Sequence, residues 1–261
     1  MTIFELAYPL KLLILKAMHI IQGYEIINLN DENRFSTNAI YAFNHSCFLD
    51  APVSVEVVKH HCYILAGVQN LRIIDKLFLY MNGVVWVDRH NAKIRNDAAR
   101  QMTELLKKGK NIIYFPEGTW NLHPAKPMLP MYWGGVNIAR ESNCPIVPVC
   151  MEYYGKKVYV RFGSPIIVQP NDDKRKKFEE LTEAFSTLKW EIWEQFPVMK
   201  RESINMGWDR EVRGRLDAYP KLDYEYEKSV IRKIYTEPEE AFAFLHSLKP
   251  CRENAFLFRN H

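Results

Sequence analysis

Short apolar runs alternate with longer amphipathic segments from residue 39 to residue 196, and this alternation restricts the possible folds more than any other feature. The short runs are rich in β-branched and aromatic residues and are predicted to be buried strands. The segments between them have the apolar spacing of helices. Strands that alternate with helices predict an α/β layered fold with a mixed, mostly parallel sheet. The predicted strands are Ala39–Phe43, Cys62–Val68, Val84–Val87, Asn111–Phe115, Ile146–Cys150 and Val158–Phe162, and the predicted helices cover residues 50–59, 71–81, 91–108, 133–141 and 172–196.

Polar segments follow three of these predicted strands, after Phe43, Val87 and Phe115. In a parallel sheet the carboxyl ends of the strands lie at the same edge, and such sheets bind ligands there. We therefore expect the three segments to meet at one rim of the sheet.

The length of 261 residues suits one large domain with appendages. Residues 1–30 are predicted to form an N-terminal amphipathic helix, and residues 31–197 the α/β domain. Residues 198–261 mix charges of both signs with aromatic side chains. They are predicted to form a helical appendage, to which the sequence assigns no chemistry.

Composition and charge exclude several classes of protein. A hydrophobic content of 48% with 25% charged residues is typical of a globular chain and excludes disorder. The formal net charge of +4 is too small to indicate nucleic acid, so no such partner is expected. The five cysteines are irregularly spaced and contain no CxxC pair, which favours a reducing, cytoplasmic setting. His60, His61 and Cys62 are adjacent but lack the spacing of metal ligands, so no metal site is expected.

The N-terminal segment from Phe4 to Ile27 is rich in leucine and isoleucine. Because Lys11, Lys16 and His19 interrupt it, it lacks the roughly 20 consecutive apolar residues that a membrane span needs. These three side chains fall on one face of a helix, with apolar residues around the rest. Two interpretations stay open: a helix packed on the domain's own core, or a helix that lies in the membrane interface.

The loop of residues 42–52 (AFNHSCFLDAP) places a histidine and an aspartate between an apolar run and a proline. Residues five apart diverge on a continuous helix, but a tight loop that ends with Asp50 as the N-cap of a helix folds His45 back onto Asp50. The carboxylate then orients one ring nitrogen, and the other serves as a general base for a hydroxyl that arrives with a substrate. The alternative, Cys47 as a nucleophile activated by His45, is disfavoured because side chains separated by one residue diverge.

Two further motifs stand at strand ends. In GVVWVDR (residues 83–89) a strand delivers Arg89, which forms either a surface ion pair or a grip on an anion such as phosphate. In YFPEGTW (residues 114–120) a strand leads into Glu117 and Gly118. This motif is either a plain turn with glycine at positive φ, or a turn that lets a ligand approach while Glu117 holds Arg89.

A fourth stretch, CPIVPV at residues 144–149, enters and interrupts a strand with prolines. Proline lacks the N–H that a sheet needs, so this strand is expected to be irregular or at an edge. It is either plain core or the lining of an apolar groove for an acyl chain.

In this order, the four stretches resemble the motifs of the glycerolipid acyltransferase family, which includes lysophosphatidic acid acyltransferases. The family pattern NHxxxxD, GxxxxxDR, FPEGTR and a proline-flanked VP strand stands here as NHSCFLD, GVVWVDR, FPEGTW and PIVPV, followed by FGSPI at residues 162–166. The resemblance covers about residues 40–166.

The resemblance implies an O-acyltransferase of phospholipid biosynthesis. The acyl group of acyl-CoA or acyl-carrier protein would pass to the free hydroxyl of a lysophospholipid, with lysophosphatidic acid the expected acceptor and no further cofactor. His45 is then the general base and Asp50 its partner, while Arg89 and the Glu117-Gly118-Thr119 turn bind the acceptor's glycerol phosphate. Because the family acts at membranes, the N-terminal helix is expected to dock on a membrane surface, with the protein peripheral at its cytoplasmic face.

The chain departs from the family pattern where the acceptor's charge would bind. Trp120 stands in place of the arginine after Glu-Gly-Thr, and residues 132–135 read YWGG where many members have Phe-Lys-Lys-Gly. Losing one charge-assisted phosphate contact costs about 1.5–3 kcal/mol, and Arg89 and Lys126 are the residues expected to compensate for it. Two other interpretations stay open. One is a different lipid acceptor, such as a glycolipid or monoacylglycerol, with the tryptophans against a sugar or an acyl chain; the other is an acyl-thioester hydrolase in which His45 activates water.

Overall fold

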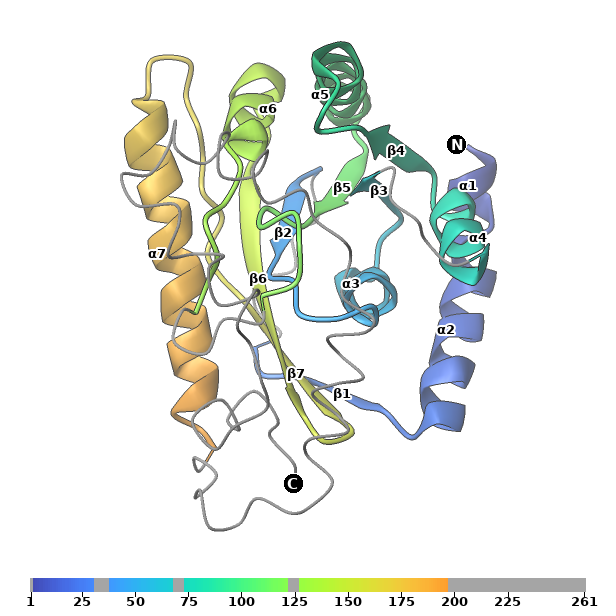
Figure 1. The fold of residues 1–261 in the computed structure, drawn as a ribbon. Helices are drawn as coiled ribbons and strands as arrows, with labels where there is room; N and C mark the ends of the chain where they lie inside the picture. The colour runs from blue at the N-terminus through green and yellow to red at the C-terminus, as the bar shows by residue number, and fades with distance from the viewer. Residues whose placement is uncertain (1, 31–37, 68–72, 122–126, 197–261) are drawn as a thin grey trace.

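One seven-stranded sheet forms the centre of the fold (Figure 1). The computed structural model describes residues 2–30, 38–67, 73–121 and 127–196. Its strands are β1 (Glu25–Asn28), β2 (Ile40–Phe43), β3 (Cys62–Gly67), β4 (Val84–Val87), β5 (Asn111–Tyr114), β6 (Ile146–Tyr154) and β7 (Lys157–Phe162). They are ordered β1-β7-β6-β2-β5-β3-β4, and every neighbouring pair is parallel except β6 with β7. The predicted α/β fold with a mixed, mostly parallel sheet is confirmed.

Helices cover both faces of this sheet (Figure 1). Apolar side chains of α5, α6 and α7 form the core on one face, and those of α2, α3 and α4 form the core on the other. The helices are α1 (Ile3–Leu6), α2 (Tyr8–Gln22), α3 (Asp50–Val58), α4 (Ile73–Met81), α5 (Ala92–Lys107), α6 (Gly134–Ser142) and α7 (Lys174–Trp193). The predicted appendage at residues 198–261 lies outside the described residues, and the division at residues 30 and 197 stays a prediction.

The parallel register brings the ends of β2, β5 and β4 to one edge of the sheet. β2 lies beside β5, and β3 joins β5 to β4 with all these pairs parallel. The loops that follow Phe43, Tyr114 and Val87 therefore leave the sheet on the same side, as the sequence predicted. This rim carries the candidate site.

The proline-flanked strand β6 is not at an edge, so that expectation is wrong. It lies between β2 and β7, parallel to one and antiparallel to the other. Pro148 pairs with Ala42 in the register with β2, and its carbonyl accepts a hydrogen bond from Gly163 N at 2.8 Å. β6 also continues past Cys150 to Tyr154, because its second half forms an antiparallel ladder with β7.

The N-terminal segment is not one helix up to Ile27, so that expectation is also wrong. Gly23 adopts the left-handed conformation (φ 72°) that ends α2. Residues 25–28 then form β1, which extends the sheet by pairing parallel with β7. A short apolar run such as this one fits a helix and a strand equally well in the sequence.

Helix α2 turns its polar side chains inward. Lys11 and His19 are buried against the domain, and only Lys16 of the three predicted basic positions is exposed. Lys11 Nζ donates to Met81 O at 2.8 Å, and burial lowers its pKa to about 8. His19 Nδ1 lies 2.6 Å from Glu56 Oε2 on α3. Apolar side chains of α2 therefore face outward.

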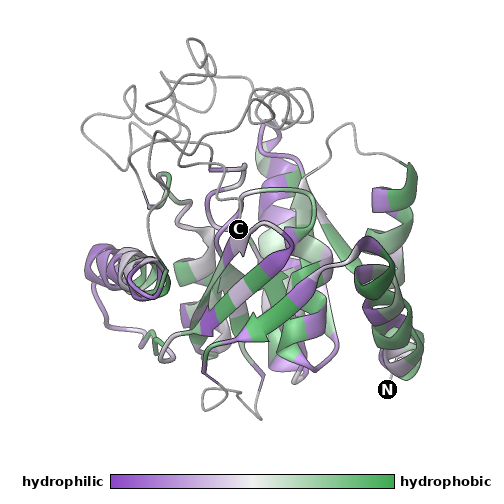
Figure 2. Cartoon of the chain, turned by 90° about the horizontal axis from the view of Figure 1, so that it is seen from below, coloured by the Kyte–Doolittle hydropathy of each residue, from purple (hydrophilic) through white to green (hydrophobic). Residues whose placement is uncertain are grey.

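These outward side chains form a surface that we call the apolar face, in which hydrophobic residues of α1, α2 and α4 are exposed (Figure 2). The three helices lie together at one side of the molecule (Figure 1). No helix in the described part of the chain is long and apolar enough to cross a bilayer. The apolar face consists of Ile3, Leu6, Leu10, Leu13, Ile14, Met18, Ile20, Ile21, Ile73, Ile74, Leu77, Tyr80 and Met81.

Candidate active site

The loop after β2 brings His45 onto Asp50, as the sequence predicted. Nδ1 of His45 lies 2.7 Å from Oδ2 of Asp50, and the His45 ring stacks on Phe115 at a centroid distance of 4.4 Å. The side chain of Asp50 is fully buried, whereas that of His45 is 20% exposed. The carboxylate of Asp50 is thus inaccessible, whereas the imidazole of His45 is partly exposed to solvent.

Asp50 is the first residue of α3 and not its N-cap, which is Leu49. Its carboxylate nevertheless caps the loop, since Oδ2 accepts from the main-chain N–H groups of Ser46 and Cys47. Oδ1 accepts from the hydroxyl of Tyr153 at 2.6 Å. Burial opposes the ionisation of Asp50, but the hydrogen bonds from His45, Tyr153 and Cys47 outweigh it and hold its pKa below the ordinary value.

An ionised Asp50 fixes the proton of His45. A carboxylate only accepts hydrogen bonds, so the neutral imidazole carries its proton on Nδ1. The lone pair then lies on Nε2, the nitrogen that a general base uses. An imidazole held in this way can accept a proton from a hydroxyl without any serine or cysteine nucleophile.

Cys47 is buried beneath the loop. Its Sγ lies 3.6 Å from Oδ1 of Asp50, and its main-chain N–H donates to Oδ2. A thiolate beside a buried carboxylate is disfavoured, so the geometry supports the role of a packed thiol rather than a nucleophile.

Glu117 ties two loops together at the rim. Its Oε1 accepts from His45 N at 2.9 Å and its Oε2 from Leu129 N at 2.7 Å. Asn121 N donates to His45 O at 2.6 Å, so the two loops exchange hydrogen bonds. Burial raises the pKa of Glu117 to about 7, against the charge of Lys189 and the two amide donors. The expectation that Glu117 holds the fork of Arg89 is therefore replaced by a different contact: both of its oxygens accept from main-chain amides.

Arg89 lies against the glycine of the neighbouring turn. A Cβ on Gly118 would stand 2.8 Å from Nη1 of Arg89 and 2.7 Å from the ring of Tyr132, and Gly118 has φ +67°. Nη1 of Arg89 donates to the hydroxyl of Tyr132 at 2.9 Å. Only glycine suits this position, and Tyr132, which the sequence did not single out, orients the arginine.

Trp120 and Trp133, which stand where the family pattern has basic residues, contact different parts of the protein. Trp120 is 7% exposed and meets the His45 ring edge-on, with centroids 6.1 Å apart. Trp133 stacks on Phe178 of α7 at 4.9 Å, within the domain's own core. Trp133 therefore contributes to the packing of α7, and the interpretation in which both tryptophans contact the acceptor stays a prediction.

Two of the predicted site residues remain, Thr119 and Lys126. Thr119 is buried beside the turn. Lys126 lies outside the described residues, so its expected compensating charge stays a prediction. His45, Asp50 and Glu117 come together through hydrogen bonds, and Gly118 comes into contact with Arg89.

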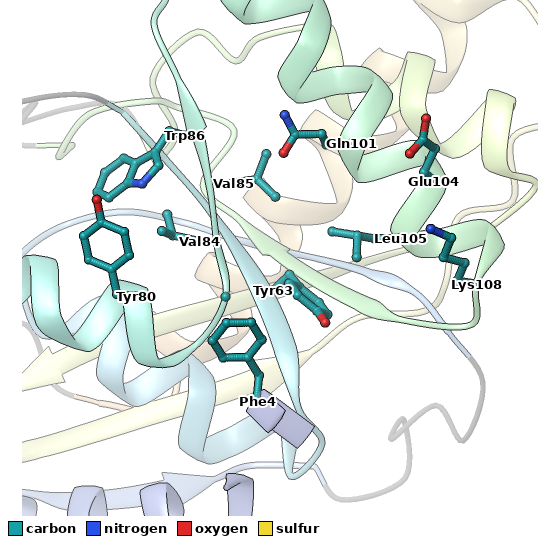
Figure 3. A pocket seen from close by; sticks show the side chains of 11 residues that line it. Phe4, Tyr63, Tyr80, Val84, Val85, Trp86, Gln101, Glu104, Leu105 and Lys108 are labelled. Carbon is teal, nitrogen blue, oxygen red and sulfur yellow. The ribbon is translucent and has the colours of Figure 1, made fainter. Parts of the chain in front are cut away.

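A separate hollow of about 380 Å³ opens beside β4 (Figure 3). Phe4, Tyr63, Tyr80 and Trp86 line one part of it, and side chains of α5 line the other. Among the predicted site residues that the structure describes, none lines this hollow. Its aromatic wall adjoins the apolar face through α1 and α4.

Comparison with known proteins finds similarity to acyltransferases. The family model described as Acyltransferase matches residues 25–152. The chain is 31% identical over 153 residues to 1-acyl-sn-glycerol-3-phosphate acyltransferase alpha of Ovis aries, a match that covers 56% of this chain and 52% of that protein. It is 26% identical over 149 residues to the 1-acyl-sn-glycerol-3-phosphate acyltransferase of Saccharomyces cerevisiae, which covers 56% of this chain and 49% of that protein. The matches span about half the length of these relatives.

A solved structure shares the fold. The crystal structure of the 1-acyl-sn-glycerophosphate acyltransferase PlsC from Thermotoga maritima matches with a TM-score of 0.54 at 20% identity. The match covers 70% of this chain and 79% of that chain. At this identity the likeness supports the layered architecture alone.

Proposed function

We propose that this chain is a glycerolipid acyltransferase that transfers a fatty acyl group from an acyl thioester to a lysophospholipid. The match of residues 25–152 to the Acyltransferase family model and the similarity to 1-acyl-sn-glycerol-3-phosphate acyltransferases support this proposal. The proposed donor is acyl-CoA or acyl-carrier protein, and the proposed acceptor is lysophosphatidic acid. The observation that carries the proposal is the 2.7 Å contact between His45 Nδ1 and buried Asp50, at the rim where Arg89 also lies.

The proposed reaction needs no acyl-enzyme. Nε2 of His45 accepts the proton of the acceptor's hydroxyl as its oxygen attacks the thioester carbonyl carbon. The C–S bond then breaks, and the leaving thiolate takes the proton from His45. Asp50 stays ionised throughout and stabilises the imidazolium that forms between the two proton transfers.

Arg89 is the proposed contact for the acceptor's phosphate. Tyr132 orients its guanidinium beside the turn at Gly118, where no Cβ blocks a ligand. A charge-assisted hydrogen bond to phosphate contributes about 1.5–3 kcal/mol, which is roughly 10- to 150-fold in acceptor preference. Trp120 supplies no charge and lies against His45, so Arg89 carries more of the phosphate binding here than the family pattern requires.

A panel of acceptors tests the proposal. We expect thiol release from an acyl thioester to be at least about 10-fold faster with lysophosphatidic acid than with monoacylglycerol or a lyso-glycolipid. Arg89→Met should remove this preference, whereas Arg100→Met, which changes an exposed arginine on α5, should keep it. Release only with neutral or sugar-bearing acceptors would contradict the phosphate assignment and favour the acceptor that Trp120 suggests.

The apolar face is the proposed membrane-docking surface, with the protein peripheral at the cytoplasmic face of a membrane. Its exposed isoleucines and leucines are unusual for a soluble surface, while the polar groups of α2 are used inside the domain. Lys16 and Lys76 are exposed on the same helices and suit anionic headgroups. A bilayer surface satisfies both features.

Vesicle flotation tests this docking surface. Ile20 and Ile21 are 76% and 84% exposed, and burying each in lipid contributes about 1.5–3 kcal/mol. We therefore expect the double variant Ile20→Asp/Ile21→Asp to partition at least about 100-fold less onto vesicles of phosphatidylcholine and phosphatidylglycerol. Ile167→Asp, at an exposed isoleucine outside the apolar face, is the matched control. Equal partitioning of the double variant and the wild type would contradict the proposal.

A further inference from the structure

The two carboxylate oxygens of Asp50 are held by different parts of the chain. Oδ2 receives its donors from the loop itself, namely the His45 ring and the main-chain N–H groups of Ser46 and Cys47. Oδ1 receives the hydroxyl of Tyr153 at 2.6 Å, from a residue 103 positions further along the chain. The other groups near Oδ1, Ser46 Oγ at 3.4 Å and Cys47 Sγ at 3.6 Å, are more distant. Tyr153 therefore provides the strong hydrogen bond to this oxygen.

Tyr153 reaches Asp50 because β6 runs beyond the end of β2. The main-chain ladder between the two strands ends where Asn44 N donates to Val149 O at 3.4 Å, and the side chain of Asn44 continues it. Asn44 Oδ1 accepts from Met151 N at 2.6 Å, and its Nδ2 donates to Met151 O at 2.9 Å. Tyr153 lies two residues further on the same face of the strand. The two hydrogen bonds between Asn44 and Met151 therefore fix the position of the loop relative to Tyr153.

The Tyr153 hydroxyl has the properties of a permanent donor. Burial raises its pKa well above the usual value, and the neighbouring charge of Asp50 raises it further. The phenol therefore stays protonated and donates across the working range of pH. Because Asp50 is ionised, it accepts this bond at Oδ1 while Oδ2 remains directed at the imidazole.

We propose that Tyr153 is a positioning residue for the acyl transfer, whose hydroxyl holds the Asp50 carboxylate so that Oδ2 stays aimed at Nδ1 of His45. The inference rests on the proposed function for its effect on turnover. The positioning itself belongs to the free enzyme and is measured without substrate. Tyr153 does not touch the reacting atoms and acts only through Asp50.

The neighbouring tyrosine gives a matched control. Tyr153 packs in the cluster that contains α2 and α3, whereas Tyr154 is buried in the cluster on the opposite face of the sheet. Tyr154 contacts the rings of Tyr159 and Phe196. Tyr154→Phe therefore removes one hydroxyl from the same strand without touching Asp50, and any general loss of packing affects both variants.

The effect on pH dependence follows from the groups around Asp50. His45 and Cys47 face it from its own loop, Tyr153 from β6, and the charge of Glu117 acts on it from the loop after β5. The hydrogen bond from Tyr153 helps to hold the pKa of Asp50 below its ordinary value, so without the hydroxyl Asp50 takes up a proton at a higher pH. In Tyr153→Phe the activity should therefore fall on the acid side at a higher pH than in the wild type.

The experiment compares wild type, Tyr153→Phe and Tyr154→Phe in the full chain by three measurements: steady-state kinetics against pH, thermal unfolding, and the ¹⁵N–¹H signal of the His45 Nδ1 proton. We expect Tyr153→Phe to lower kcat about 10- to 100-fold, in the range for loss of a hydrogen bond to a charged group, with the acceptor KM within about twofold. The Nδ1 proton signal should shift in Tyr153→Phe and stay in place in Tyr154→Phe.

Two results would overturn the inference. One is an unchanged Nδ1 signal with kcat within about twofold of the wild type. The other is a fall in kcat that matches the loss of folded protein in both variants, since that reports packing alone. If the wild type transfers no acyl group but the Nδ1 signal still shifts in Tyr153→Phe, the proposed function fails while the positioning stands.

Discussion

His45→Ala should lower the turnover of acyl transfer at least about 1,000-fold while the protein stays folded. The imidazole is the basic group of the described loop that meets the buried carboxylate, and it retains partial exposure to solvent. General-base catalysis by a positioned side chain contributes about 10²- to 10⁴-fold. Cys47 is poorly placed to replace it as a nucleophile, because its thiol is buried beside Asp50. The measurement is thiol release with lysophosphatidic acid at saturating donor.

The control for this variant is His60→Ala, which removes an exposed histidine from the loop after α3. It should retain wild-type turnover, and the two variants should have thermal unfolding midpoints close to that of the wild type. If His45→Ala kept lipid-dependent activity within about 10-fold of the wild type, the assignment of the base would be wrong.

Asp50→Asn should lower kcat about 100- to 10,000-fold, the second largest effect that the geometry predicts. The amide keeps the size of the carboxylate and one acceptor oxygen for the loop, but it loses the charge that stabilises the imidazolium. It also allows the ring to adopt the tautomer with its proton on Nε2, which is inactive as a base. The acceptor KM should change little, because the side chain of Asp50 is fully buried.

The stability of Asp50→Asn separates charge loss from unfolding. Asp50 has a lowered pKa in the folded state, so its ionisation stabilises the fold above its unfolded pKa and this contribution is lost as the pH falls through the folded pKa. The variant should therefore be less stable than the wild type at pH 7 and approach it in acid. Asp97→Asn, on the exposed face of α5, should match the wild type in kcat and in stability. A kcat of Asp50→Asn within about 10-fold of the wild type would show that the charge is not needed.

Much of the fold was predictable because local signals agreed with it. Val84–Val87 is a strand with the predicted bounds, and Asn91 caps α5 by accepting from Lys93 N and Ile94 N. Gly109 follows that helix with φ 74°. In each of these places a residue with one strong conformational preference marks the boundary.

Other elements depended on partners far away in the sequence. β1 exists because β7 offers it an edge, and β6 extends to Tyr154 because β7 folds back along it. Neither pairing leaves a local pattern that distinguishes strand from helix or loop. The inward-facing polar side of α2 was missed for the same reason, since the partners of Lys11 and His19 are Met81 and Glu56.

The candidate site was predictable where its contacts are short in sequence. His45 and Asp50 are five residues apart, and a tight loop suffices to join them. Tyr132 and Tyr153 reach Arg89 and Asp50 from 43 and 103 residues away. A tyrosine hydroxyl has no spacing rule of its own, so only the folded sheet reveals that both tyrosines orient charged groups at the rim.

Thiol release and ester formation, followed together in one reaction with and without acceptor, test the central claim most directly. The account predicts that the two rates are equal, that release stops when the lipid acceptor is left out, and that no acylated protein accumulates before the acceptor is added. Steady thiol release without acceptor would contradict it by making water the substrate of His45, and a stoichiometric burst of thiol before acceptor addition would contradict it by revealing an acyl-enzyme.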